Sequence, residues 1–246
     1  MGGTVKVGAG AGDARKDRWT THRARRRREF VDAALRVLEL QGPDLLMDAV
    51  AAEAGVTKPV LYRYFSDKAE LVEALAERGS EILAERLLPA INAGTPALAS
   101  VRDGVAAYFA VIDEYPNLYW LLARHVTIEG GRLSGPVQRN KESIASALTV
   151  VFSDYLWVFG LDSGGAEPWA YGVTGLVQST GEWWLQRRSM SRAHVVDLVT
   201  RLIWAALSGL LREAGIAVDP DQPLPGLHPS LLGLIGDRPA GQVTPE

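Results

Sequence analysis

The chain has 246 residues, of which 47% are hydrophobic and 22% are charged, the composition of a globular protein with a substantial core. The absence of cysteine excludes disulfide bonds, thiolate zinc sites and cysteine nucleophiles. The net charge of −3 is unevenly distributed, because residues 1–68 carry 13 basic and 9 acidic residues, net +4, whereas residues 69–246 carry 13 and 20, net −7. A basic N-terminal part on an acidic body favours a polyanionic partner.

The first residues do not have the pattern of an export signal. In MGGTVKVGAGAGDARKDRW, glycines and charges stand where a signal peptide needs an apolar stretch, and no run of about 18 uncharged apolar residues follows. We therefore expect a cytoplasmic protein with no membrane partner. Residues 1–20 predict a flexible basic, glycine-rich arm, and the proline-rich residues 216–246 predict a tail whose segment SLLGLIG could dock on the body.

Apolar residues recur at helical spacing from the first basic run onwards. Phe30, Ala34 and Leu38 predict a first helix that ends near residues 41–43, and Val50 begins the apolar face of a short second helix that Gly55 closes.

Thr57 and Pro59 suit the start of a third helix, and residues 66–67 suit the cap of a long fourth helix that stops at Pro89. Further helices are expected at residues 97–114, 116–126, 136–159, 167–188 and 192–214. Convincing alternating strands are absent, so the predicted fold class is all-α with about nine helices.

The third helix carries an unusual set of side chains in the segment GVTKPVLYRYF. Leu61 and Phe65 are four residues apart and share the face that points to the core. This leaves outside a set of cations, hydroxyls and a small apolar patch: Lys58, Pro59, Val60, Tyr62, Arg63 and Tyr64. Such a face suits the DNA major groove, and the preceding helix and turn complete a helix-turn-helix. For Tyr62 and Tyr64 the alternative is ordinary amphipathic packing.

The motifs RRREFVDAALRVLELQG and DAVAAEAGVTKPVLYRYFSDKAELVEAL, within residues 24–76, resemble the N-terminal domain of the TetR family of bacterial transcriptional regulators. The resemblance implies a DNA-binding domain at residues 21–66, in which Lys58, Pro59 and Val60 face base edges. It implies phosphate contacts from Tyr62, Tyr64 and Lys68. The predicted DNA-binding set is completed by Arg26, Thr57 and Arg63.

Two departures from the family pattern affect the second helix. Leu45, Leu46 and Met47 occupy positions where a capping threonine is common, so a cap contact to phosphate is not expected. Asp48 stands where a base-reading arginine sometimes sits, so this helix is expected to contribute little to sequence readout. The basic run at residues 23–28 could reach flanking phosphates or the minor groove, or it could be a solvated charge cluster.

The resemblance also implies that residues 67–215 form a helical domain that dimerises and binds a small effector. Small and apolar residues at helical spacing predict a four-helix dimer interface, with closure of the protomer core as the alternative. The predicted interface residues are Val177, Trp184, Val195, Val199, Leu202, Ala206 and Gly209.

Large aromatics on the middle helices predict an apolar effector pocket, although most of them must belong to the core. The candidate lining residues are Tyr108, Ile112, Trp120, His125, Phe152, Tyr155 and Gln178. They suggest a hydrophobic effector such as an acyl chain, a sterol fragment or an aromatic compound. The resemblance implies that an effector that tilts the helix at residues 67–88 changes the spacing of the two reading helices and so releases the DNA. It also implies repression, which is the family's usual mode of regulation.

An enzyme is the competing class of function. His22, His125, His194 and His228 show no metal-ligand spacing, and GAGAG at residues 8–12 follows no strand and lacks a later glycine-lysine-serine element. We therefore expect no catalytic residue, no metal and no cofactor besides the effector. A transcriptional activator and a DNA-binding protein without sequence preference remain alternatives.

Overall fold

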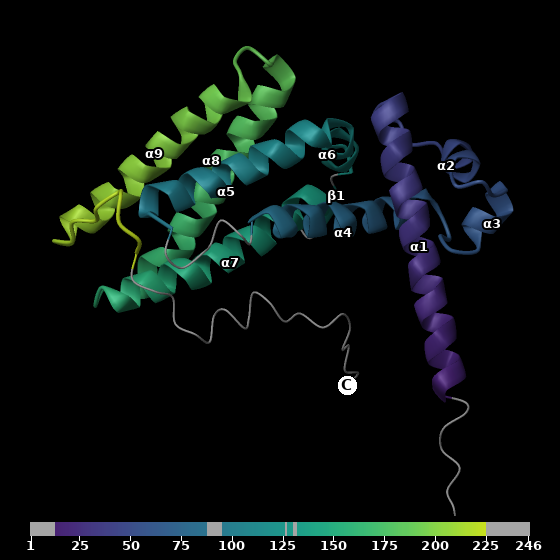
Figure 1. The fold of residues 1–246 in the computed structure, drawn as a ribbon, viewed down its shortest axis with the longest axis horizontal. Helices are drawn as coiled ribbons and strands as arrows, with labels where there is room; N and C mark the ends of the chain where they lie inside the picture. The colour runs from purple at the N-terminus through teal and green to yellow at the C-terminus, as the bar shows by residue number, and fades with distance from the viewer. Residues whose placement is uncertain (1–12, 88–94, 126, 130–131, 225–246) are drawn as a thin grey trace, which may run out of the picture. The chain divides into compact units, whose positions relative to one another are not determined.

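The computed structural model describes residues 13–87, 95–125, 127–129 and 132–224 (Figure 1). Most of the predicted N-terminal arm and the tail segment SLLGLIG lie outside the described residues. The elements in chain order are α1 (Asp13–Gln41), α2 (Met47–Glu53), α3 (Lys58–Tyr62), α4 (Lys68–Leu87), α5 (Ala97–Glu114), α6 (Pro116–Ala123), β1 (Thr127–Glu129), β2 (Arg132–Ser134), α7 (Pro136–Val158), the 3₁₀ helix η2 (Ser163–Gly165), α8 (Ala166–Arg187) and α9 (Arg192–Glu213).

The predicted all-α class is confirmed, with nine α-helices in the described part of the chain. Two differences from the prediction are local. Helix α1 begins at Asp13 rather than near Arg23, because the sequence from Asp13 to Gln41 contains neither glycine nor proline to interrupt it. Between α6 and α7, where a loop was expected, β1 and β2 form a short antiparallel hairpin in which Thr127 pairs with Ser134.

The chain divides into two compact units, residues 1–78 and 79–246. In the first unit, α2 packs against α1 and α3 packs against α2, and the predicted inward residues Leu61 and Phe65 are both fully buried. The division falls after Arg78 rather than at the predicted 66–67 junction, since Leu71 and Leu75 of α4 are also fully buried. The first turns of α4 therefore belong to the helix-turn-helix unit.

The turn between α2 and α3 depends on Gly55, which has a φ of +66°. This is the left-handed conformation that residues with a Cβ rarely adopt, as expected for the residue that ends a helix. The Val56 N–H then donates to the Ala51 carbonyl at 2.9 Å, which closes the end of α2 and turns the chain into α3.

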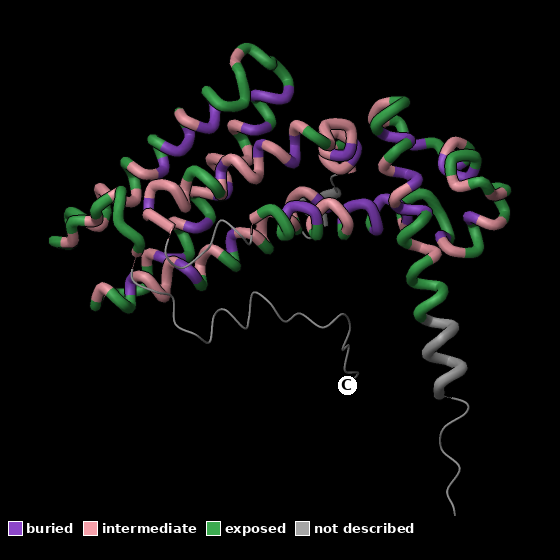
Figure 2. The backbone as a smooth tube through the Cα atoms, viewed as in Figure 1, coloured by how far each residue is buried: buried purple, intermediate pink, exposed green. Residues whose placement is uncertain are grey.

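In the second unit, α7 packs along α8 and α5 packs along α9 (Figure 1). Buried residues recur at intervals along each helix, as the purple segments of the backbone in Figure 2 show. A core cluster joins α5, α8 and α9, and its buried members are Val105, Phe109, Ile112, Trp184, Leu185, Val195, Val196, Val199 and Ile203. The chain after α9 returns to α5, where the Ala97 N–H donates to the Gln222 carbonyl at 3.0 Å.

Helix α9 is, within the described residues, the one helix long and apolar enough by length and composition to cross a membrane. Its composition has a structural cause. Val195, Val199 and Ile203 form a buried stripe in the core cluster, and Leu198, Leu202 and Leu210 form a second stripe that is exposed in the protomer.

Gly181 sets how closely α8 approaches α5. A Cβ at this position would lie 2.7 Å from Cε1 of Tyr108 and 2.9 Å from Cδ1 of Ile112, closer than van der Waals contact permits. Gly172, on the same helix, has open space around its own added Cβ.

We predict that Gly181→Ala destabilises the protein by about 1–3 kcal/mol, because the added methyl group overpacks the contact with Tyr108. The matched control Gly172→Ala should instead stabilise it by about 0.5–1 kcal/mol through helix propensity. Urea titration of both variants measures the difference. Equal stabilities would mean that the close approach at Gly181 does not constrain the packing.

Candidate functional site

The face of α3 opposite the core is exposed. Thr57, Lys58, Pro59, Tyr62 and Arg63 are all exposed, while Val60 is half-buried. The Thr57 hydroxyl makes no N-cap hydrogen bond to α3. The structure therefore brings six of the nine predicted DNA-binding residues onto one short segment. Three kinds of group occur there: cations, hydroxyls and a small apolar surface.

The other three predicted residues, Arg26, Tyr64 and Lys68, flank this face. Lys68 is exposed at the start of α4. The Tyr64 ring is half-buried and packs edge-on against Phe30, with ring centroids 5.1 Å apart. The Arg26 guanidinium donates to Glu29 at 2.6 Å and lies 5.2 Å from the centre of the Phe30 ring. In the free protein, Tyr64 and Arg26 thus also serve packing within the unit.

Arg27, from the same basic run, points inward and was not predicted as a site residue. Its guanidinium donates to the Tyr64 carbonyl and, at 2.6 Å, to the Glu70 carboxylate. It also lies 4.3 Å from the centre of the Phe65 ring. One side chain of α1 therefore holds the segment that leaves α3 and the first turn of α4.

Glu70 completes this arrangement. Its carboxylate accepts from the Ser66 backbone N–H at 2.6 Å, and its own N–H donates to the Asp67 carboxylate at 2.8 Å, the reciprocal pattern of a helix cap. The Ser66 N–H and the Arg27 guanidinium together lower the pKa of Glu70 from 4.5 to about 2. The carboxylate is thus stabilised in its ionised form.

We predict that this network makes the stability of the protein sensitive to acid. Because the pKa of Glu70 is lower in the folded protein than in the unfolded chain, the ionised carboxylate stabilises the fold above pH 4.5. This contribution to stability is lost as the pH falls from 4.5 towards 2. Glu70→Gln should reduce the pH dependence of the urea midpoint in this range. The control Glu77→Gln, which removes an exposed carboxylate of the same helix, should leave that dependence unchanged. Identical pH profiles for wild type and Glu70→Gln would show that Glu70 is not the source of the acid sensitivity.

Asp48 and Lys58 form an ion pair at the N-terminal ends of α2 and α3. The Lys58 ammonium lies 3.1 Å from both carboxylate oxygens of Asp48. The N-cap of α2 is Leu46, and it makes no side-chain cap hydrogen bond, as the sequence departure predicted.

Six of the seven predicted effector residues fall into two groups. Tyr108, Ile112 and Trp120 belong to the core cluster or pack against it. Phe152 and Tyr155 of α7 and Gln178 of α8 are half-buried and are not members of that cluster.

His125 has its ring nitrogen Nδ1 2.7 Å from the Leu121 carbonyl, a contact in which Nδ1–H donates. This hydrogen bond to the end of α6 gives His125 a local structural role.

Polar groups gather beside Tyr108. Burial raises the pKa of the Tyr108 hydroxyl, and nearby Tyr119 and Glu182 add smaller effects. Burial, followed by the charge of Glu182, raises the pKa of Tyr119 to about 12. On α7, burial is the main cause that raises the pKa of Tyr155, and the charge of Asp154 adds to it. Tyr119 and Glu182 were not predicted as site residues. The aromatic region between α5, α6 and α8 thus combines apolar surface with neutral hydroxyl groups.

The predicted dimer residues divide according to burial. Trp184, Val195 and Val199 are at most 4% exposed, and they lie in the core of the protomer. This placement corresponds to the alternative in which they close the protomer core. By contrast, Leu202 is 55% exposed, Ala206 is exposed, and Val177 and Gly209 are half-buried.

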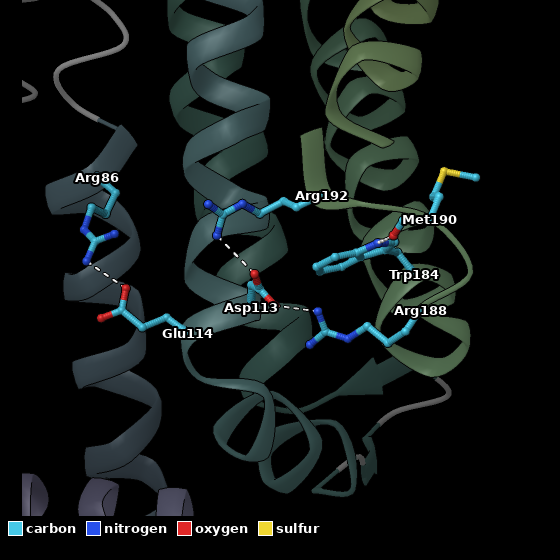
Figure 3. Close-up of polar contacts among 7 residues, drawn as sticks. All are labelled: Arg86, Asp113, Glu114, Trp184, Arg188, Met190 and Arg192. Carbon is cyan, nitrogen blue, oxygen red and sulfur yellow. Dashed lines mark hydrogen bonds and ion pairs between the residues drawn. The ribbon is translucent and has the colours of Figure 1, made fainter. Parts of the chain in front are cut away.

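Trp184 is further held by polar contacts at the turn between α8 and α9 (Figure 3). Its indole N–H donates to the Met190 carbonyl at 2.9 Å, and the Arg188 guanidinium lies 4.1 Å from the ring centre. Arg188 and Arg192 both pair with Asp113 of α5. Trp184 is consequently fixed within the protomer and offers no surface to a partner subunit.

Among the described residues, no group of three or more histidine, aspartate or glutamate side chains is arranged to hold a metal ion.

Two family models match the chain. Residues 30–75 match the model described as bacterial regulatory proteins, tetR family, and residues 86–216 match the tetracyclin repressor-like, C-terminal domain. An uncharacterised HTH-type transcriptional regulator of Mycobacterium tuberculosis is 33% identical over 89% of this chain and 91% of its own length. The HTH-type transcriptional activator FasR of Mycolicibacterium smegmatis is 28% identical over 66% of this chain and 73% of its own.

Solved structures agree on the fold. A tetR-family transcriptional regulator from Streptomyces coelicolor has a TM-score of 0.60 at 23% identity and covers 87% of both chains. FadR from Bacillus subtilis, in complex with stearoyl-CoA, has a TM-score of 0.57 at 16% identity, covering 71% of this chain and 96% of its own. AibR, in complex with isovaleryl coenzyme A and operator DNA, has a TM-score of 0.53 at 17% identity, covering 72% and 97%. At these identities the likeness establishes the fold.

Proposed function

This chain belongs to the TetR family of bacterial transcriptional regulators, which are DNA-binding transcription factors and not enzymes, and from that premise we propose that it is a cytoplasmic repressor. As a homodimer it binds a palindromic operator, and a small hydrophobic effector releases it. The observation that carries the proposal is the exposed face of α3, where Lys58, Tyr62 and Arg63 stand outside a fully buried Leu61.

The composition of this face supports groove binding. The N-terminal residues of a reading helix contact base edges, and Lys58 and Pro59 are the first two residues of α3. The hydroxyl of Tyr62 and the guanidinium of Arg63 are groups that donate to phosphate oxygens. Thr57 directly precedes the helix, and its hydroxyl makes no capping hydrogen bond, so it is a further donor at the same end.

We predict that Arg63→Ala weakens binding to the duplex upstream of the gene and to random duplex by similar factors. The slope of log affinity against log salt should become shallower by about 0.9, because one phosphate contact is lost. The control Arg187→Ala removes an exposed cation of α8 and should leave both quantities unchanged. Fluorescence anisotropy at several salt concentrations measures them, and an unchanged slope for Arg63→Ala would contradict the phosphate contact.

The exposed stripe of α9 supports a dimer. Leu198, Leu202, Ala206 and Leu210 are spaced by four residues and lie beside the buried stripe, so α9 is apolar over a wider face than its own protomer covers. A two-fold axis would pack this stripe against its copy, with Val177 and Gly209 at its margin. Two reading helices would then address two half-sites.

We predict that Leu202→Asp converts the dimer to a monomer, because it places a charge in the centre of the apolar stripe. The control Leu40→Asp changes a leucine of α1 that is 76% exposed and should leave the dimer intact. Native mass spectrometry of both variants reads the subunit number directly. A dimeric Leu202→Asp variant would move the interface to another surface.

For the effector we propose an acyl-coenzyme A, on two grounds. FadR and AibR, which share the fold, were solved with stearoyl-CoA and isovaleryl coenzyme A. In this chain the aromatic region around Tyr108, Ile112 and Trp120 supplies apolar surface, and Phe152, Tyr155, Gln178 and His125 stay candidates for its margin.

Helix α4 is the proposed transmitter of the effector signal. Its residues Leu71 and Leu75 are buried in the first unit, and its last turn is tied to α5 by the ion pair of Arg86 with Glu114 at 2.9 Å (Figure 3). A shift of α5 would therefore act on the helix whose first turns support α3.

We predict that stearoyl-CoA or isovaleryl-CoA lowers the affinity for upstream DNA by about 5- to 150-fold, the usual range of coupling between two sites. Coenzyme A without an acyl chain is the control and should have no effect. Anisotropy titrations with each compound test this. Binding of an acyl-CoA that leaves DNA affinity unchanged would contradict release by this effector.

A second candidate function is activation, because FasR, a relative at 28% identity, is described as a transcriptional activator. The DNA-binding face and the dimer are common to both functions. A reporter fused to the upstream region distinguishes them: expression rises on deletion of a repressor and falls on deletion of an activator.

A further inference from the structure

Opposite charges meet at the edge of the proposed DNA-binding face. Lys58 is the first residue of α3 and Asp48 is the second residue of α2. The ammonium lies 3.1 Å from both carboxylate oxygens, although the Asp48 side chain is 73% exposed. Asp48 therefore stands at the same end of α3 whose residues contact base edges in helix-turn-helix proteins.

A carboxylate at this position repels any duplex unless the duplex offers it a donor. Phosphates cannot, because they are anions. In the major groove the available donors are exocyclic amino groups, N4 of cytosine and N6 of adenine. Asp48 is thus able to discriminate between sequences even though it lowers the affinity for DNA in general.

The paired lysine selects between these two donors. An ammonium is best matched by the O6 and N7 acceptors of guanine, which adjoin the cytosine amino group in a G·C pair. In the ion pair, the Lys58 ammonium is the donor and the Asp48 carboxylate is the acceptor. Side by side, they match the guanine acceptors and the cytosine amino donor of a G·C pair. In an A·T pair the adenine offers the lysine one acceptor only.

Resting on the proposed function, we propose that Asp48 is a specificity-determining residue that accepts a hydrogen bond from a cytosine amino group in each half-site, while Lys58 donates to guanine. Asp48 also penalises duplexes that lack this pair. Helix α2 therefore takes part in readout, contrary to the expectation from its sequence.

A purely structural role for Asp48 is the alternative, since an acidic residue in the first turn stabilises a helix. That role would change the melting temperature and would act equally on all DNA sequences. The test must therefore read base preference, affinity for random duplex and thermal stability separately.

The experiment is selection of binding duplexes from a random pool by the full-length wild type and by the variants Asp48→Ala, Asp48→Asn and Glu39→Gln. Glu39→Gln is the matched control, because it removes an exposed carboxylate of α1 and should preserve every preference. We expect the wild type to enrich cytosine at one position of each half-site.

Asp48→Ala should lose about tenfold of discrimination at that position alone. It should bind random duplex more tightly, with a salt slope steeper by about 0.9 because Lys58 is free to pair with phosphate. Asp48→Asn should shift the preference to adenine, which asparagine reads through two hydrogen bonds. Melting temperatures should match that of the control.

An Asp48→Ala variant with unchanged base preferences would overturn the inference, as would uniform weakening at every position together with a lowered melting temperature. A wild type that enriches no sequence over the random pool would overturn the proposed function itself and the inference with it. Enrichment by the wild type with no dependence on residue 48 overturns the inference alone.

Discussion

The burial of Leu61 and Phe65 is the constraint on which the DNA-binding unit depends. Helix α3 has five residues, too few to be stable by its own hydrogen bonds, so its orientation comes from these two fully buried side chains. Once they face Phe30 and the rest of the core, the intervening Tyr62 and Arg63 have only the solvent side left. The exposed face is therefore a consequence of packing, and it is fixed as firmly as the core.

The sequence predicted this part of the molecule well, because local signals agree with one another. The spacing of Leu61 and Phe65, the left-handed Gly55 and the proline in the first turn of α3 all indicate the same short helix after a tight turn. Most helices of the second unit were predicted for the same reason, since proline and glycine separate long apolar periodicities. The start of α1 was missed, because charged residues without apolar spacing give no sign of where a helix begins.

Contacts between elements could not be read in this way. Arg27 looked like its neighbours in a basic run, yet it is three residues before Phe30 and therefore shares that residue's inward face, a signal that the charge of the run obscured. The pairing of Asp48 with Lys58 joins two helices across a turn whose geometry no local pattern specifies. In α9 the buried stripe and the exposed stripe are both apolar and lie next to each other on the helix surface. Only the packing of the folded protomer shows which of the two it covers.

Amide hydrogen exchange is the most direct test of whether the exposed face of α3 binds DNA. The protein would be compared free and bound to the duplex upstream of its gene, with exchange read along the described residues. We expect new protection from exchange to concentrate at residues 57–68, with little change in α7. Protection that leaves residues 57–68 unchanged and appears on another surface would contradict it.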